Sequence, residues 1–153
     1  MSIPAVGAKA PAFSLVNTAG AVVTNDTFAG KKNVLLAFFP LAFSSTCTAE
    51  LCEMRDDHEL FVSRGVEILP ISVDSTYTLK EYKAKHQFRV DFLSDFRREV
   101  SRRYDELMEE RFYSNRAYFL IDRAGIIRWK HVEETPSHRR DDAQLFAAID
   151  AAV

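Results

Sequence analysis

The stretch NVLLAFFPLAFSSTC, residues 33–47, decides the fold class of this chain. Its first seven residues form a continuous apolar run that ends at Pro40, which is typical of a strand buried on both faces. After Pro40 the pattern changes to a period of three and four residues and continues until Gly65, which predicts one long helix. The residues that carry this period are Leu51, Met54, His58, Phe61 and Val62. A buried strand followed directly by a helix indicates an α/β protein.

The remaining elements alternate in the same way. We expect a β-hairpin at 13–24, a buried strand at 66–73, a short or irregular strand at 90–96, strands at 116–122 and 125–132, and helices at 76–88, 99–108 and 141–152. Helical crossovers between buried strands imply parallel pairing, and the final hairpin adds an antiparallel edge. The order predicts a thioredoxin-like α/β sandwich with an N-terminal β-hairpin and an insertion. No repeat or linker divides residues 1–153, so we expect a single domain.

The composition limits the possible functions. The chain has 153 residues, of which 47% are hydrophobic and 27% charged, and its net charge of −2 argues against a nucleic-acid or anionic-membrane partner. The first residues lack the basic and apolar regions of a signal peptide, and no apolar run has membrane-spanning length. Two cysteines do not make a disulfide scaffold, so we expect a cytoplasmic protein. The four histidines are scattered, and we predict neither a metal site nor a cofactor.

Cys47 lies where the chain leaves the buried strand and enters the helix. We expect it in the first helical turn, with Ser45 or Thr46 as the N-cap. Free backbone N–H groups and the helix dipole stabilise an anion there, so the position favours a nucleophilic thiolate. The alternative is that Cys47 is a small buried hydrophobic residue. Its neighbours are Ser and Thr, which favours the reactive interpretation.

Pro40, Ser44 and Cys47 have the spacing P-x-x-x-[TS]-x-x-C. Three further stretches are GAKAPAFSL at 7–15, FLSD at 92–95 and NRAYFLIDRAGIIR at 115–128. In this order, these motifs resemble the signature and landmarks of the peroxiredoxins, the AhpC/TSA family of thiol peroxidases. The match most resembles the alkyl hydroperoxidase E branch, usually described as one-cysteine enzymes. It departs mildly at Ala12, where many members have Asp, and at Ser44, where Thr is commoner.

The resemblance implies that Cys47 attacks a peroxide and becomes a sulfenic acid. Ser44 would hydrogen-bond the sulfur or the peroxide, and Arg116 would hold the thiolate and polarise the peroxide. Pro40 would shield the sulfur from water. Taken singly, Ser44 is also explained as a cap-region hydroxyl, Pro40 as a strand stop and Arg116 as a surface ion-pair partner.

Two further residues and the partners follow from the same resemblance. Glu50, three residues after Cys47, would orient Arg116 or a neighbour, and Phe43 would line an apolar entrance for organic hydroperoxides. The electron donor would be thioredoxin, a glutaredoxin-like protein or a low-molecular-weight thiol. The resemblance also implies a homodimer. The charged segment RRYDELMEERF, residues 102–112, is unusual on the substrate side.

Cys52 allows two interpretations. On an intact helix it lies about 7.5 Å along the axis and roughly 140° around it from Cys47, so a disulfide between the two requires unwinding. The peroxiredoxin Q branch has a second cysteine at this spacing and unwinds to form the bond, and we hypothesise that Cys52 is a resolving cysteine. Otherwise Cys52 is a packed helix residue and an outside thiol resolves the sulfenic acid.

Other functions remain as alternatives. A thioredoxin-like disulfide oxidoreductase is disfavoured because C-x-x-C is absent. A non-enzymatic redox sensor or binding protein would use Cys47 only as a switch.

Overall fold

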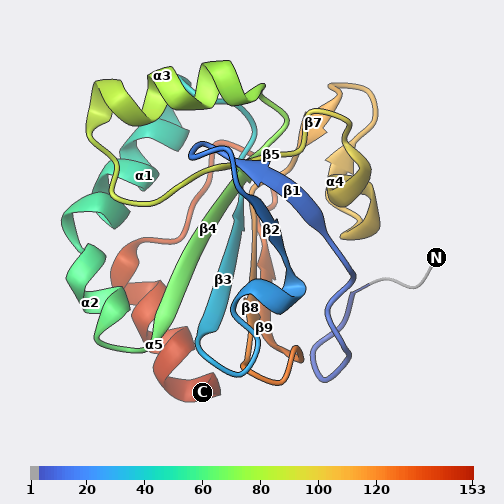
Figure 1. The fold of residues 1–153 in the computed structure, drawn as a ribbon, viewed down its shortest axis with the longest axis vertical. Helices are drawn as coiled ribbons and strands as arrows, with labels where there is room; N and C mark the ends of the chain where they lie inside the picture. Colours follow the sequence, from blue (N-terminus) through green and yellow to red (C-terminus); the bar gives the residue numbers. More distant parts are fainter. Residues whose placement is uncertain (1–3) are drawn as a thin grey trace.

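Strand β3 (Asn33–Phe38) lies inside a seven-stranded sheet in the computed structural model, which describes residues 4–153 (Figure 1). The strand order is β2-β1-β5-β4-β3-β8-β9, and β6 and β7 form a separate hairpin. The other strands are β1 (Ser14–Asn17), β2 (Val22–Thr24), β4 (Val66–Ser72), β5 (Leu93–Ser94), β6 (Leu107–Met108), β7 (Tyr113–Ser114), β8 (Ala117–Ile121) and β9 (Ile127–Val132). The helices are α1 (Ser45–Asp56), α2 (His58–Val62), α3 (Thr76–His86), α4 (Glu99–Arg103) and α5 (Asp142–Ala152), with a 3-10 turn at Asn25–Thr27.

Both faces of β3 are buried, as its continuous apolar run predicts. Alternate residues point to opposite faces of a strand, and they contribute to two separate cores. Residues of α1, α2, α3 and α5 cover one face, whereas α4 and the N-terminal segment cover the other. Strand β3 pairs in parallel with β4 and antiparallel with β8, which in turn pairs antiparallel with β9. The prediction of a thioredoxin-like sandwich with a final antiparallel hairpin is confirmed.

The predicted single helix after Pro40 is wrong in one respect, because it is two helices. Asp57 leaves the helical conformation at φ −96° and ψ 14°, and it separates α1 from α2. Phe61 of α2 is buried in the core on this side of the sheet. The predicted N-cap, Ser45 or Thr46, is also wrong by one or two residues, since Ser44 is the cap and Ser45 is the first helical residue.

The segment after α3 differs more from its predicted form. The helix expected at 99–108 stops at Arg103, because Asp105 adopts a left-handed φ of 59° that a helix cannot continue through. The chain then forms the β6–β7 hairpin. The N-terminal hairpin is joined to the main sheet, because β1 pairs with β5. Helix α5 begins at its N-cap Asp141 with a capping box to Gln144.

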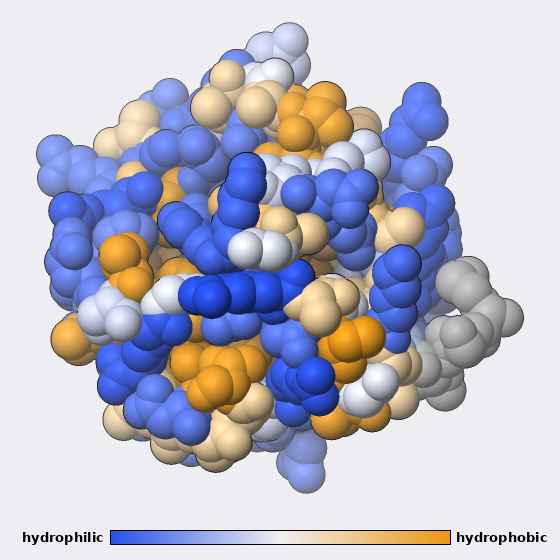
Figure 2. Space-filling view, turned by 60° about the horizontal axis from the view of Figure 1, so that its bottom comes forward, coloured by the Kyte–Doolittle hydropathy of each residue, from blue (hydrophilic) through white to orange (hydrophobic). Residues whose placement is uncertain are grey.

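Within residues 4–153, no helix is long and apolar enough to cross a bilayer. Figure 2 brings forward the end of the molecule where the C-terminus lies, and its surface is mostly hydrophilic with small, separate hydrophobic patches. The carboxyl end of β3 and the start of α1 lie at the opposite end of the molecule from the C-terminus (Figure 1). Cys47 is in this first turn of α1.

Candidate active site

Cys47 is the third residue of α1 and lies beneath the turn that connects β3 to this helix. Pro40 follows the end of the strand and Ser44 caps the helix in an extended conformation. The Cys47 side chain is only 1% exposed. Because the first N–H groups of a helix have no intrahelical acceptor, this turn surrounds the sulfur with the positive end of the helix dipole.

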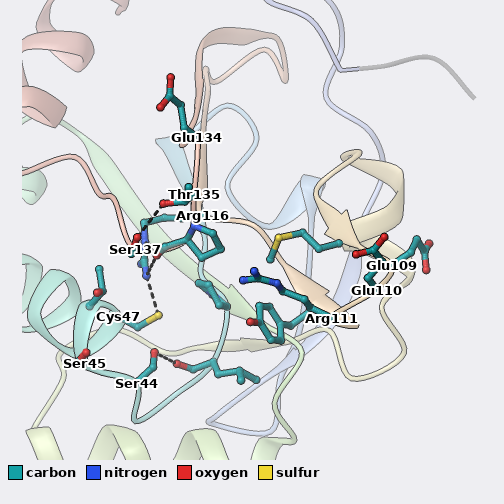
Figure 3. A pocket seen from close by; sticks show the side chains of 16 residues that line it. Ser44, Ser45, Cys47, Glu109, Glu110, Arg111, Arg116, Glu134, Thr135 and Ser137 are labelled. Atoms are coloured by element: carbon teal, nitrogen blue, oxygen red, sulfur yellow. Dashed lines mark hydrogen bonds between the residues drawn. The ribbon is translucent and has the colours of Figure 1, made fainter.

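Arg116 brings a permanent positive charge to the sulfur from another element. It lies directly before β8, and its buried Nη2 donates a hydrogen bond to Cys47 Sγ at 3.0 Å, drawn as a dashed line in Figure 3. Its Nη1 donates to Glu50 Oε1 at 2.8 Å. Burial by itself would lower the pKa of Arg116, but the neighbouring Glu50 and Cys47 outweigh it and raise that pKa. The guanidinium therefore stays charged, and it contacts the sulfur and a carboxylate at the same time.

The backbone also positions Arg116. Its Nε and Nη2 donate to the carbonyl oxygen of Pro136, at 3.2 and 3.1 Å. Its own backbone N–H donates to the Asn115 side chain, and its carbonyl accepts from the N–H of Glu133. Four of these contacts come from residues outside α1, so the guanidinium position does not depend on the cysteine helix alone.

Glu50 is the buried counter-ion of this site. It has no exposed surface, and its second oxygen accepts a hydrogen bond from the hydroxyl of Tyr118. Burial raises the pKa of Glu50, and Arg116 and Tyr118 oppose that rise because each donates to one carboxylate oxygen. Burial and the adjacent Glu50 raise the pKa of Tyr118, so its hydroxyl keeps its proton and remains a donor.

A pocket of about 840 Å³ opens in front of Cys47 and Arg116 (Figure 3). One wall is the turn before α1, a second is the loop after β9, and a third is the β6–β7 hairpin. The lining residues are Pro40, Leu41, Ser44, Ser45, Thr46, Cys47, Met108, Glu109, Glu110, Arg111, Tyr113, Arg116, Glu134, Thr135, Pro136 and Ser137. The pocket gives a small molecule access to a sulfur that is otherwise buried.

The other residues proposed from the sequence take different positions. Pro40 is buried and lines the pocket beside Cys47, and Ser44 lines it too. The Ser44 hydroxyl donates to the Leu41 carbonyl at 2.7 Å, so in this structure it stabilises the turn. Phe43 does not line the pocket. Its backbone is left-handed at φ 68°, and its ring lies against Tyr82 with a centroid distance of 4.8 Å.

Cys52 lies one and a half turns after Cys47 on the same continuous helix. Its side chain is half-buried and packs against the core on the helical face of the sheet. Both cysteines are free thiols. Glu50, with its contacts to Arg116 and Tyr118, lies between them in the chain.

Sequence reasoning missed Tyr118, the Pro136 carbonyl and the wall formed by the β6–β7 hairpin. A signal for Tyr118 was available, because residues two apart on a strand point to the same face and Tyr118 lies two residues after Arg116. Pro136 lies in a loop without periodicity, and no local pattern indicates it. The helix predicted at 99–108 overlaps the hairpin only at β6, and residues 102–112 were expected on the substrate side without a predicted turn.

Known proteins are similar in sequence to this chain over nearly its whole length. The model of the AhpC/TSA family matches residues 6–130. The chain belongs to the AhpC/TSA family. It is thus a peroxiredoxin, an oxidoreductase of the thiol peroxidase class, as its motifs predict.

Individual relatives agree with this assignment. Alkyl hydroperoxide reductase E of Mycobacterium tuberculosis is 39% identical over 148 residues, which cover 95% of this chain and 96% of that protein. A putative peroxiredoxin bcp of Buchnera aphidicola is 36% identical over 79% of this chain and 75% of its own length. The reduced 2-Cys peroxiredoxin of Plasmodium vivax has a TM-score of 0.87 and 34% identity, and the match covers 95% of this chain and 80% of that one.

Proposed function

We propose that this peroxiredoxin reduces hydrogen peroxide and organic hydroperoxides with Cys47 as the peroxidatic thiolate. The observation that carries the proposal is the hydrogen bond from Arg116 Nη2 to Cys47 Sγ at the base of an open pocket. A charged donor at this distance stabilises the thiolate, since a hydrogen bond to an ionised group is stronger than one between neutral groups. The names of the relatives, alkyl hydroperoxide reductase E and peroxiredoxin, support the same chemistry.

In the proposed reaction the Cys47 sulfur attacks the distal oxygen of the peroxide. The S–O bond forms as the O–O bond breaks, and the leaving oxygen takes a proton and departs as water or an alcohol. Arg116 stabilises the charge that moves onto the leaving oxygen, because its guanidinium has several donors in one plane. Pro40 limits the access of water, and Ser44 holds the turn that presents the sulfur. The product is a Cys47 sulfenic acid.

Resolution of this sulfenic acid is proposed to use Cys52, which would form an intramolecular disulfide and release water. Helix α1 must unwind first, because positions five residues apart on a helix are too distant for a disulfide. Unwinding would displace Glu50 from Arg116, and breaking a buried ion pair costs about 3–5 kcal/mol. The alternative is an outside thiol that attacks the sulfenic acid directly, a route that leaves α1 and this ion pair intact.

The reductant is proposed to be thioredoxin, a glutaredoxin-like protein or a low-molecular-weight thiol, and the protein is proposed to be a cytoplasmic homodimer. Exposed hydrophobic side chains offer a surface for a second copy, among them Leu41, Phe43, Tyr77, Phe96 and Phe112. Sedimentation of the reduced protein tests the dimer, because a monomer at micromolar concentration contradicts it.

The function is tested by stopped-flow peroxide consumption with wild type, Cys47→Ser and Cys52→Ser. We expect Cys47→Ser to lose the fast reaction entirely, whereas Cys52→Ser keeps the first turnover. Intact mass after one equivalent of peroxide then separates the two routes of resolution. A loss of two hydrogens in wild type but not in Cys52→Ser supports the disulfide, and a persistent gain of one oxygen on Cys47 supports the outside thiol. Equal, slow consumption by wild type and Cys47→Ser would disprove the peroxidase function.

A further inference from the structure

The pocket in front of Cys47 is much larger than hydrogen peroxide requires. Its volume is about 840 Å³, whereas a water molecule, only a little smaller than hydrogen peroxide, takes up about 30 Å³ in the liquid. Volumes of this size are typical of sites for whole organic molecules. Apolar side chains line part of it, namely those of Leu41, Met108, Tyr113 and Pro136. The pocket therefore has room for a co-substrate that extends well beyond its reacting group.

Within residues 4–153, one cation on the far wall of this pocket, the exposed Arg111, has no ion-pair partner. Arg111, in the turn of the β6–β7 hairpin, points toward the side where Cys47 and Arg116 lie (Figure 3). Among the residues that the structure describes, no carboxylate forms an ion pair with it within 4.0 Å. Other arginines of the same region are engaged, because Arg102 pairs with Glu109 at 3.0 Å and Arg98 stacks on Phe112 at 4.3 Å.

The turn that presents Arg111 is anchored on both sides. Its backbone is closed by hydrogen bonds from the N–H groups of Arg111 and Phe112 to the Met108 carbonyl, at 3.1 and 2.7 Å. The guanidinium of Arg98 donates to the Phe112 carbonyl at 3.2 Å, and the Arg102–Glu109 ion pair ties the other arm to α4. An anchored turn loses little entropy when its side chain binds a ligand.

Three carboxylates also line the pocket, and they do not cancel this cation. The charge of Glu109 is already balanced by Arg102. In Figure 3 the carboxylates of Glu109 and Glu110 lie on the side of the hairpin away from Cys47, and that of Glu134 points away from the pocket. Among the described residues, the pocket therefore has one buried guanidinium at the sulfur and a second, exposed one on the opposite wall with no carboxylate paired to it.

We propose that Arg111 is an anion-binding specificity residue, which holds the carboxylate of a co-substrate while its reacting group lies at Cys47. The inference rests on the proposed peroxidase function and names the substrate chemistry of the same site. The carboxylate belongs either to an organic hydroperoxide in the oxidative step or to a small thiol in the reductive step. Arg111 makes no contact with the sulfur, so it acts on binding and orientation rather than on the bond that breaks.

The test compares matched co-substrates that differ only in charge. Sulfenic acid formation is followed by stopped flow with an organic hydroperoxide that carries a terminal carboxylate and with its methyl ester. Reduction of the preformed sulfenic acid is followed in Cys52→Ser with a carboxylate thiol and with the corresponding amide. Each is measured for wild type, Arg111→Gln and Arg111→Lys. Arg97→Gln is the matched control. It removes the same positive charge, but the exposed Arg97 side chain lies outside this pocket.

In one of the two steps, Arg111→Gln is expected to slow the charged co-substrate about 2- to 5-fold and leave the neutral one unchanged, as for an exposed ion pair. Arg111→Lys should retain most of the preference, added salt should weaken it, and Arg97→Gln should preserve it. The step affected identifies the source of the carboxylate. Equal effects on charged and neutral co-substrates in both steps would overturn the role of Arg111. If no hydroperoxide reacts in a Cys47-dependent way, the proposed function fails, and this inference fails with it.

Discussion

Cys47 and Cys52 lie five residues apart on one helix, but their surroundings differ in kind. Cys47 is 1% exposed and accepts a hydrogen bond from a buried guanidinium at the base of a pocket. Cys52 is half-buried and packs against hydrophobic core residues. Position along the helix explains part of the difference, because the dipole acts mainly on the first turn. The rest of the difference comes from Arg116, which lies directly before β8 and contacts Cys47 but not Cys52.

The two halves of α1 form hydrogen bonds with different parts of the molecule. Its first half is tied to β8 through Glu50, Arg116 and Tyr118. Its second half is tied to the start of α5, because Glu53 of α1 accepts hydrogen bonds from the Arg139 side chain and from the backbone N–H of Asp142. Changes on one side should therefore separate the behaviour of the two cysteines.

The largest effect is expected from Arg116→Gln. Loss of the charged donor removes about 2–3 kcal/mol of thiolate stabilisation, so alkylation of Cys47 should slow about 100-fold while that of Cys52 stays unchanged. Peptide mass spectrometry after timed alkylation measures both rates in one sample.

The same substitution leaves Glu50 buried without its partner, which destabilises the fold by about 3–5 kcal/mol. The double variant Arg116→Gln, Glu50→Gln is the control, because it removes both charges and should regain much of the stability. If the double variant is stable and Cys47 still reacts at the wild-type rate, Arg116 is not the source of its reactivity.

An intermediate effect is expected from Glu50→Gln alone. The amide keeps one acceptor for Arg116 but removes the ion pair, which makes unwinding of the first half of α1 easier by about 1–2 kcal/mol. After one equivalent of peroxide, the Cys47–Cys52 disulfide should form about tenfold faster than in wild type, as measured by quenched intact mass. An unchanged rate would mean that unwinding does not limit resolution, or that Cys52 does not resolve.

The smallest effect is expected on the Cys52 side, from Asp142→Asn. Burial, together with the nearby carboxylates of Asp57 and Glu53, raises the pKa of Asp142 to about 8, and among the described residues both its oxygens lack a hydrogen-bond partner. The folded state therefore retains a proton that the unfolded chain loses near pH 4, and stability is lost as the pH rises from about 4 to about 8. Asparagine has no titrating proton, so Asp142→Asn should remove most of this pH-dependent decline in the free energy of unfolding.

Urea unfolding at several pH values measures the decline. Asp141→Asn is the matched control, because Asp141 is the exposed N-cap of α5 and asparagine caps equally well. Parallel pH profiles for wild type and Asp142→Asn would contradict the prediction. Cys47 alkylation should be the same in both variants if the two halves of α1 are independent.

Much of the fold could be predicted from local patterns. The apolar run of β3, the hairpin at 13–24 and the helix at 141–152 each have a clear local signal, and each was predicted. The errors fall where local signals are weak or contradictory. The segment at 99–108 has a helical composition, but the left-handed Asp105 ends its helix early and the chain turns into the β6–β7 hairpin. The charged segment 102–112 was expected on the substrate side, but no local signal predicted the hairpin turn that brings Arg111 to the pocket.

The sequence by itself determined the α/β class, the family and the cysteine at a strand-to-helix turn, because periodicity, turn residues and motif spacing are properties of neighbouring residues. Only the tertiary structure decided which groups meet the sulfur. Arg116 is 69 residues from Cys47 in the chain, and Tyr118 is 68 residues from Glu50. The Pro136 carbonyl that accepts from Arg116 lies in a loop without sequence periodicity. Contacts over such separations depend on how β8 pairs with β3, and that pairing is set by the burial of both faces of the sheet rather than by any local sequence.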